Sequence, residues 1–137
     1  MIPLTSITTD IKNMVITAVC DYYEVSFDSI VKSNKNKTRK AEIIYPRQVI
    51  EYCLKVVAHE SPSAISRITG VYHATVLHSA TTIQNDVDCG NQRGLKALPV
   101  IQELNKMIRA HRARKLEKKE DFKSDIESEL EEILNMK

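Results

Sequence analysis

The chain has 137 residues and a formal net charge of +2, and glycine, proline and aromatic residues are scarce. A chain of this length builds one domain with a modest hydrophobic core and leaves residues for a tail. Apolar residues recur at helical spacing and do not alternate between turn signals, which predicts an all-α protein. No apolar run is as long as a membrane span and residues 1–10 lack a signal-peptide pattern, so we expect a cytoplasmic protein without a membrane partner.

The small net charge conceals two opposite charge clusters. Residues 32–47 hold six basic side chains and one acidic one, whereas residues 120–137 hold seven acidic side chains and two basic ones. Local patches of this kind say more about partners than the average charge does. The basic cluster suits a polyanion such as DNA.

Residue types that carry catalysis or bind metals lack a usable arrangement. The three cysteines are far apart and odd in number, which is typical of reduced, mostly buried thiols. His73 and His78 lie about 140° apart around a helix, which argues against a zinc site. None of the three glycines is followed by lysine and then serine or threonine, so a phosphate-binding glycine loop is missing. No Ser-His-Asp set can be identified either. We therefore expect no enzyme activity, no metal, no cofactor and no bound nucleotide.

The first two helices are predicted from spaced apolar residues and capping residues. A helix over about 9–23 has an apolar face formed by Ile11, Met14, Val15, Ala18, Val19 and Tyr22. A short helix over 26–31 follows, with Ser26 as its cap and Ile30 in the core. Residues 32–40, KSNKNKTRK, are too charged to bury and indicate a polar surface loop.

A third helix is predicted to begin at Pro46, because the fixed φ of proline suits a first helical position, and to end near His59. Its apolar stripe is Val49, Ile50, Cys53, Leu54 and Val57. The residues expected at or near the surface are Arg47, Gln48, Glu51 and Lys55.

Residues 61–84, SPSAISRITGVYHATVLHSATTIQ, predict a short helix, a tight turn and a longer second helix. Ser61 suits the cap of the first helix, with Pro62 in its first turn. Gly70 supplies the positive φ that ends such a helix without Cβ strain. We interpret this stretch as a helix-turn-helix, although the pattern also fits a helical hairpin that binds no DNA.

The second helix of this motif has an apolar and a polar side. The residues expected to face the core are Val76, Leu77, Ala80 and Ile83. The residues expected on the exposed side are Tyr72, His73, Thr75, His78 and Ser79. Short polar side chains can hydrogen-bond base edges in a major groove, which is wide enough to admit a helix. Ala74 and the methyl group of Thr75 can contact thymine methyl groups.

The last third of the chain predicts a loop, a helix and a charged tail. The loop covers about 85–93, and the helix starts near Gln92 or Leu95 with Pro99 in its first turn or at a kink. Its inner face is Leu98, Ile101, Leu104 and Ile108. The tail, 109–137, has an amphipathic helical stripe of Phe122, Ile126, Leu130 and Ile133 or Leu134. The residues leave open whether it packs on the domain, pairs with a second copy or a partner helix, or stays solvated.

Two motifs, in this order, resemble a known family. Tyr45-Pro46-Arg47-Gln48 follows the basic loop, and His73-Ala74-Thr75-Val76-Leu77-His78-Ser79-Ala80 begins the second helix of the motif. They resemble the carboxyl-terminal DNA-binding domain of the bacterial replication initiator DnaA, whose signature reads Asp-His-(Thr/Ala)-Thr-Val-Leu-His-Ala. The similarity covers about residues 7–108. It implies a compact helical bundle with the helix-turn-helix at its centre.

The resemblance implies roles for individual residues. Positions at the major groove correspond here to Arg47, His73 and Thr75. Positions at the sugar-phosphate backbone correspond to Gln48 and His78. The basic loop of the family reaches the neighbouring minor groove, which corresponds to Arg39 and Lys40. The complete set of predicted DNA contacts is Lys35, Lys37, Arg39, Lys40, Arg47, Gln48, Lys55, Ser61, Tyr72, His73, Ala74, Thr75, His78 and Ser79.

The chain departs from the family pattern beside these motifs. The family carries Arg-Asp before the signature histidine, where this chain has Val71-Tyr72, and Ala41 stands at a second basic position of the loop. A carboxylate that can accept from cytosine is therefore missing, together with two guanidinium groups. We expect these departures to affect recognition of the DNA sequence that the initiator binds. We do not expect them to prevent binding to double-stranded DNA in general. The initiator's ATPase module is missing too, so we expect a stand-alone domain of the kind that phages or mobile elements encode.

Two hypotheses follow for the whole chain. In the first, residues 1–108 form a nucleoid-associated domain that binds specific double-stranded DNA sequences and controls replication initiation or transcription, and residues 109–137 form a charged helical tail. In the second, Val71 and Tyr72 have removed specific reading. The tail then makes the chain a module for protein interaction or oligomerisation.

Overall fold

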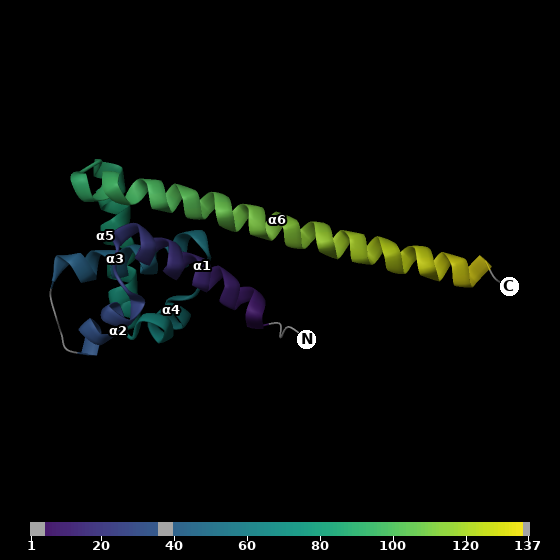
Figure 1. Cartoon of the computed structure of the whole chain (residues 1–137), viewed down its shortest axis with the longest axis horizontal. Helices are drawn as coiled ribbons and strands as arrows, with labels where there is room; N and C mark the ends of the chain where they lie inside the picture. Colours follow the sequence, from purple (N-terminus) through teal and green to yellow (C-terminus); the bar gives the residue numbers. More distant parts are fainter. Residues whose placement is uncertain (1–4, 36–39, 136–137) are drawn as a thin grey trace. The chain divides into compact units, whose positions relative to one another are not determined.

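The computed structural model describes residues 5–35 and 40–135, and this part of the chain is helical without a strand (Figure 1). Its elements are α1 (Thr5–Tyr23), α2 (Phe27–Lys35), α3 (Ala41–Tyr52), the π-helical turn η1 (Cys53–Val57), α4 (Pro62–Thr69), α5 (His73–Cys89) and α6 (Gln92–Asn135). The predicted all-α class is confirmed. None of the described helices combines the length and apolar character needed to cross a membrane.

The chain divides into two compact units, Met1–Asn105 and Lys106–Lys137. The first unit contains α1 to α5 and the beginning of α6, and the second contains the rest of α6. The predicted helical tail is confirmed, because residues 106–135 are continuous helix.

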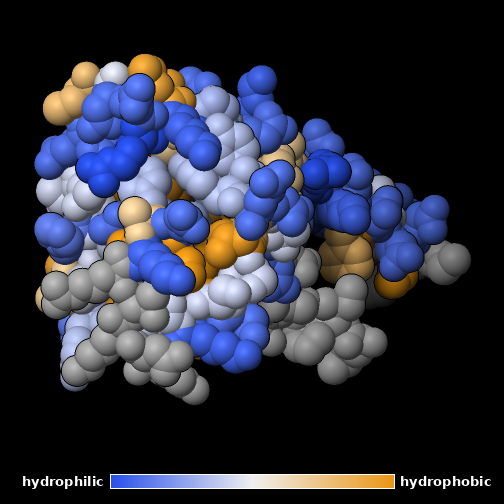
Figure 2. Space-filling view, turned by 60° about the vertical axis from the view of Figure 1, so that its left-hand side comes forward, coloured by the Kyte–Doolittle hydropathy of each residue, from blue (hydrophilic) through white to orange (hydrophobic). Residues whose placement is uncertain are grey.

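The core of the first unit is built around α3 and η1, which contact α1 and α4, while α3 also packs on α2 and α5. The side chains with no exposed surface include Val15, Val19, Ile30, Val49, Ile50, Leu54, Ile65, Val76, Ile83 and Leu104. Full burial of such a side chain contributes about 1.5–3 kcal/mol. The predicted apolar stripe of the third helix is confirmed, since all five of its residues are buried. Hydrophilic side chains dominate the face in Figure 2, with apolar ones in small areas.

Three helix boundaries differ from the sequence prediction. α1 starts at Thr5 instead of near residue 9, and α2 continues to Lys35, into the predicted polar loop. α3 starts at Ala41, with Pro46 in its interior rather than at its beginning. Pro46 has no N–H to donate to the fourth residue before it. Burial of Tyr45 and Pro46 explains why the helix forms there nevertheless.

The predicted loop over 85–93 is wrong, because α5 continues to Cys89 and α6 begins at Gln92. Gly90, with φ of 66°, ends α5 in the left-handed conformation. The Asn91 side chain donates to Asp86 Oδ1 at 2.8 Å. Only Gly90 and Asn91 therefore connect the two helices. Pro99 is the eighth residue of α6, so it does not lie in the first turn.

α5 and α6 approach each other closely at Gly94. A Cβ atom at this position would lie 2.0 Å from the backbone oxygen of Asp86. The Gly94 N–H donates to the Asn91 side-chain oxygen at 2.8 Å, which begins α6. Only glycine allows this contact between the two backbones.

Asp86 joins α5 to α3 as well as to α6. Tyr45 donates its hydroxyl to Asp86 Oδ2 at 3.0 Å, and a guanidinium nitrogen of Arg93 lies 3.8 Å from the same oxygen. The Arg93 guanidinium also lies over the Tyr45 ring, 5.2 Å from its centroid. Burial and the bond to Asp86 raise the pKa of Tyr45 to about 12. We call Tyr45, Asp86, Asn91 and Arg93 the Asp86 junction.

Candidate DNA-binding surface

α4, the turn after it and α5 form the predicted helix-turn-helix. The Ser61 hydroxyl accepts a hydrogen bond from the Ala64 N–H at 3.1 Å, so the predicted cap of α4 is confirmed. Pro62 is the first residue of the helix. Gly70 ends α4 with φ of 80° and ψ of 19°, as the positive-φ prediction requires.

The turn between the two helices is short and held at both ends. The Gly70 N–H donates to the Ser66 carbonyl oxygen at 2.8 Å, and the Ser66 hydroxyl donates to the Val71 carbonyl oxygen. Tyr72 then adopts an extended conformation, and its carbonyl oxygen accepts from the Thr75 N–H at 2.9 Å. The chain therefore turns within three residues, and α5 begins directly after the turn.

The first turn of α5 presents several of the predicted contacts to solvent. Tyr72 is 83% exposed, and His73, Ala74 and His78 are exposed while Thr75 is half-buried. The predicted exposure of Tyr72, His73 and His78 is confirmed, and that of Thr75 holds only for part of its surface. The start of a helix also carries partial positive charge, which favours a nearby phosphate.

Two predicted orientations on α5 are wrong. Ser79 was expected on the exposed side and has no exposed surface, while Leu77 was expected in the core and is 48% exposed. Ser79 lies three residues after Val76 and four before Ile83, so the three share the inner side of the helix. Leu77 is rotated by about 100° from Val76. Ser79 is therefore not part of the surface available to DNA.

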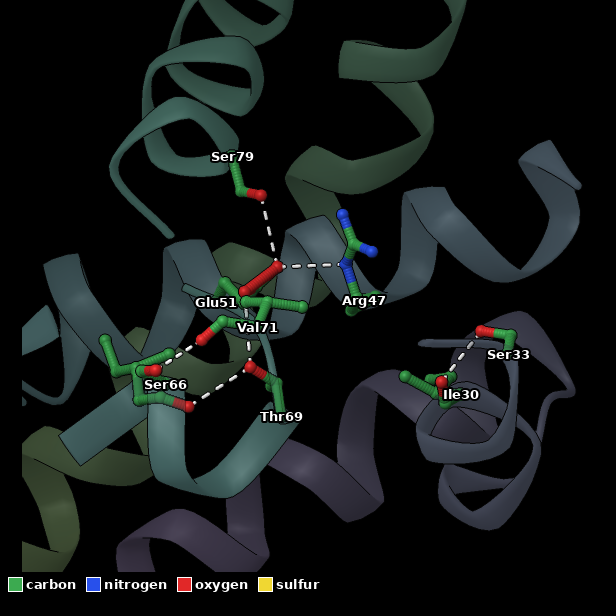
Figure 3. A network of polar contacts seen from close by, with 9 residues as sticks. Ile30, Ser33, Arg47, Glu51, Ser66, Thr69, Val71 and Ser79 are labelled. Atoms are coloured by element: carbon green, nitrogen blue, oxygen red, sulfur yellow. Dashed lines mark hydrogen bonds and ion pairs between the residues drawn. The ribbon is translucent and has the colours of Figure 1, made fainter. Parts of the chain in front are cut away.

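The Ser79 hydroxyl instead donates to Glu51 Oε1 of α3 at 3.1 Å (Figure 3). The same oxygen accepts from Arg47 Nε at 3.1 Å, one helical turn earlier on α3. Thr69, the last residue of α4, lies with its hydroxyl 3.3 Å from Glu51 Oε2 and 3.1 Å from the Ile65 carbonyl oxygen. We call Arg47, Glu51, Thr69 and Ser79 the Glu51 junction.

The Glu51 junction ties both helices of the motif to α3 through one carboxylate. Glu51 has no exposed surface, so its predicted place near the surface is wrong. Burial raises the pKa of its carboxyl above the ordinary value of 4.5, and Arg47 and the two hydroxyls act in the opposite direction. A buried charge of this kind is tolerated only when it is paired and hydrogen-bonded.

Arg47 has a structural role in addition to its predicted DNA contact. Its side chain is only 14% exposed, and its Nε donates to Glu51. The junction brings Arg47 to the inner side of α5, beside Ser79. The predicted position of Arg47 at or near the surface thus holds for a small part of the side chain.

The other predicted contacts in the described residues lie on α3 (Gln48), in η1 (Lys55) and at the N-cap of α4 (Ser61). Gln48 and Lys55 are half-buried, and Ser61 is exposed while its hydroxyl caps α4. Lys55 lines a shallow hollow whose other walls include Tyr52, Val56, Leu77, Thr81 and Gln84. The Tyr52 hydroxyl donates to the Gln84 side-chain oxygen at 2.8 Å at this hollow.

The basic segment is described only at its two ends. Lys35 is the last residue of α2, and Lys40 is exposed directly before α3. Lys37 and Arg39 lie outside the described residues. Their contacts with DNA therefore stay predictions.

Arg67 is a basic residue that the sequence reasoning missed. It is exposed on α4 and lines a hollow together with Ser66, Gly70, Val71 and Tyr72. A cation on the first helix, three residues before the turn glycine, was the available signal. Its position beside Tyr72 makes it a candidate for a phosphate contact.

An all-helical unit with this turn geometry and a polar outer side on its second helix defines a helix-turn-helix domain. A family model for the helix-turn-helix of bacterial DnaA proteins matches residues 13–83, which is more than half of the chain. The chain belongs to this family of DnaA-like DNA-binding domains.

The curated relatives that the chain matches include several proteins named chromosomal replication initiator protein DnaA. The chromosomal replication initiator protein DnaA of Chlorobaculum tepidum is 32% identical over 92 residues, covering 66% of this chain and 17% of that protein. The DnaA of Bacteroides fragilis is 32% identical over 90 residues, covering 64% and 18%. The DnaA of Kosmotoga olearia is 42% identical over 57 residues, covering 42% and 13%. The chain thus spans less than a fifth of these relatives, and no solved structure matches it.

Proposed function

We propose that the chain binds specific double-stranded DNA sequences by placing the outer side of α5 in a major groove. The observation that carries this proposal is the exposure of Tyr72, His73, Ala74 and His78 at the start of a helix whose inner side is held by the Glu51 junction. A rigid helix with free polar groups at its amino-terminal end is the geometry with which helix-turn-helix domains read base edges.

The side chains suit this task in different ways. His73 and Thr75 donate or accept hydrogen bonds at base edges, and Ala74 contacts a thymine methyl group. A good contact of this kind discriminates against a wrong base by about 1–3 kcal/mol. Tyr72 offers an aromatic ring and a hydroxyl where the resembling signature carries aspartate. We therefore expect a preferred sequence that differs from the one read by an aspartate at this position.

Basic residues beside the motif supply the affinity that does not depend on sequence. We assign phosphate contacts to Arg67 and to the basic segment, with Arg39 and Lys40 in the adjacent minor groove. The further members of this set are Lys35, Lys37, Gln48, Lys55, Ser61 and His78. Arg47, like His73 and Thr75, is assigned to the major groove. Each phosphate that a cation neutralises releases counterions and steepens the salt dependence of binding by a slope of about 0.9.

The biological output of this binding is control of replication initiation or of transcription at a few sites on the nucleoid, in the cytoplasm. The relatives named chromosomal replication initiator proteins support this part of the proposal.

A fluorescence anisotropy titration of labelled duplexes over a series of salt concentrations tests the proposal, with sequences selected from a random duplex pool. We expect affinity to fall steeply with salt and to drop roughly 5- to 100-fold in His73→Ala, which corresponds to about 1–3 kcal/mol. Asn85→Ala is the matched control, because Asn85 is exposed on the same helix more than three turns later. Affinity that ignores salt, or that is equal in His73→Ala and the control, would contradict the proposal.

The second hypothesis is an interaction module that has lost the ability to read a specific DNA sequence. Two exposed apolar residues of the helix-turn-helix support it, Tyr72 at 83% and Leu77 at 48%. The selection experiment separates the two. An enriched sequence motif supports reading by α5, and a pool that stays random supports the interaction module.

A further inference from the structure

The carboxyl-terminal part of α6 has an apolar stripe that is exposed to solvent. Phe122 is 68% exposed, Ile126 40%, Leu130 53% and Ile133 63%. Their spacings of four, four and three residues place them on one side of the helix. Single exposed apolar side chains are ordinary on a protein surface, but several in line form a patch of the kind that marks an interaction site. We call these four residues the α6 stripe.

The α6 stripe is confined to a short length of the helix. On the same side, Lys115 is half-buried two turns before Phe122, and Ile108 is 1% exposed a further two turns earlier. The exposed apolar residues in this line therefore begin at Phe122. Ile133 lies eleven residues later, which corresponds to about 16 Å of helix. A partner of a few helical turns is long enough to cover the stripe.

Acidic residues surround the α6 stripe. Residues 120–135 contain seven acids and one basic residue, Lys123, so their formal charge is −6. Asp125 and Glu129 lie within about 100° of the centre of the stripe on one side, and Glu127 lies about 105° from it on the other. A partner that covers the stripe therefore meets carboxylates at both of its edges. The complete set of acids is Glu120, Asp121, Asp125, Glu127, Glu129, Glu131 and Glu132.

These carboxylates do not stabilise the helix to which they belong. Side chains four residues apart are neighbours on a helix, and Asp125 has an acid at this distance on either side, Asp121 and Glu129. The last turn contains no basic residue, and Glu132 lies near the negative end of the helix dipole. Cations that a partner brings to this surface would offset both effects.

We propose that residues 120–135 bind a basic amphipathic helix of another protein, with the α6 stripe against the apolar side of that helix. Lysine or arginine side chains of the partner pair with Asp125 and Glu129 at one edge of the stripe and with Glu127 at the other. The apolar contact supplies the buried surface, as in other complexes that recognise an amphipathic helix. The opposite charges select the partner and speed its approach.

A basic partner suits the charge of this surface better than other occupants do. A second copy of the chain would bring the same charge of −6, because stripes in contact place acidic residues against acidic residues in a parallel and in an antiparallel pair. DNA and anionic lipid surfaces carry the wrong charge for this half of the helix. The inference concerns protein binding by residues 120–135 and does not rest on the proposed DNA binding.

Fluorescence anisotropy with a labelled synthetic peptide and the full chain tests the proposal. The peptide is built of leucine and lysine in heptads, with leucine at the first and fourth positions. We expect it to bind the wild-type chain, and its affinity to fall roughly 10- to 100-fold in the double variant Ile126→Asn, Leu130→Asn. The matched control is Ser124→Asn, Ser128→Asn, which also introduces two asparagines, on the opposite side of the helix. Absence of binding, or equal losses in the two double variants, overturns the proposal.

A second pair of variants measures the contribution of the charges. Asp125→Asn, Glu129→Gln removes two carboxylates beside the stripe, and we expect a loss of affinity of roughly 3- to 10-fold. Glu120→Gln, Glu131→Gln removes the same charge from positions farther around the helix and should cost less. Equal losses would mean that the peptide is attracted without docking on the stripe, which overturns the proposal.

Sedimentation equilibrium of the full chain alone distinguishes a second copy from a basic partner. We expect the mass of a single chain, 15.6 kDa. A dimer that dissociates in Ile126→Asn, Leu130→Asn would show that a second copy covers the stripe, and would overturn the proposal. None of these measurements contains DNA, so their failure leaves the proposed function intact.

Discussion

The two sides of α5 use polar residues in opposite ways. On the inner side, Ser79 and Asp86 are buried and each takes part in a junction that connects α5 to other helices. On the outer side, His73 and His78 are exposed. The comparison teaches that helical spacing alone does not tell which polar residues remain free to bind. Changes on the inner side should affect folding, and changes on the outer side should affect DNA binding.

The largest effect should come from removing the acceptor of the Glu51 junction. Glu51→Ala leaves Arg47 and the Ser79 hydroxyl buried without their carboxylate, and we expect the free energy of unfolding to fall by about 3–5 kcal/mol. Urea denaturation measures it. Glu42→Ala, an exposed acid on the same helix, should change it by less than about 0.5 kcal/mol. Equal effects for the two variants would mean that the junction does not stabilise the fold.

A somewhat smaller effect is expected where α5 meets α6. Gly94→Ala places a Cβ 2.0 Å from the Asp86 backbone oxygen, so the two helices must move apart. We expect a loss of about 1–3 kcal/mol in thermal or urea unfolding. Gln92→Ala, at an exposed position of the same first turn, is the control. Unchanged stability in Gly94→Ala would show that the close approach is not required.

On the outer side, Tyr72→Asp should alter DNA binding and raise stability slightly. Tyr72 is the N-cap of α5 and makes no side-chain capping bond. Aspartate at an N-cap accepts from a free N–H and stabilises a helix by about 1 kcal/mol. It also restores a carboxylate that can accept from cytosine. Selection from a random duplex pool should then enrich a different sequence, and an unchanged sequence would remove Tyr72 from the reading surface.

The smallest expected effect is a pH dependence that arises from Glu51. Its carboxyl pKa is raised above 4.5 in the folded chain, so the folded state holds the proton more tightly than the unfolded state. Above pH 4.5 and up to the raised pKa, stability from this group should therefore fall as the pH rises. The unfolding free energy of the wild type minus that of Glu51→Gln isolates the contribution of this carboxyl group, and this value should fall as the pH rises. A value that rises with pH would contradict the raised pKa.

The sequence predicted the helices and the turn of the motif better than it predicted which of their polar residues are exposed. The cap at Ser61, the positive φ of Gly70 and the buried stripe of α3 depend on neighbouring residues, and all are confirmed. Ser79 is buried because its partner Glu51 lies 28 residues earlier, a pairing that no local pattern reveals. The alanine that ends the resembling DnaA signature at this position was the available signal for a small, buried residue.

Helix boundaries were missed where tertiary contacts override local preferences. Pro46 indicated a helix start, but burial of Tyr45 extends α3 five residues further toward the amino terminus. Asp86, Gly90 and Asn91 indicated a loop, but the Asp86 junction keeps α5 helical through Cys89. The bond between Tyr45 and Asp86 bears on both errors, and it joins residues 41 positions apart, which no local pattern reveals.

The most direct test of the two-sided account of α5 compares His73→Ala with Ser79→Ala, measuring duplex affinity and the free energy of unfolding for both. We expect His73→Ala to weaken binding roughly 5- to 100-fold with stability unchanged within about 0.5 kcal/mol. Ser79→Ala should cost about 1.5–3 kcal/mol of stability, because a bond to a carboxylate is lost. Its duplex affinity under native conditions should stay at the wild-type value. The reverse pattern, with Ser79→Ala weakening binding and His73→Ala only unfolding the domain, would contradict the account.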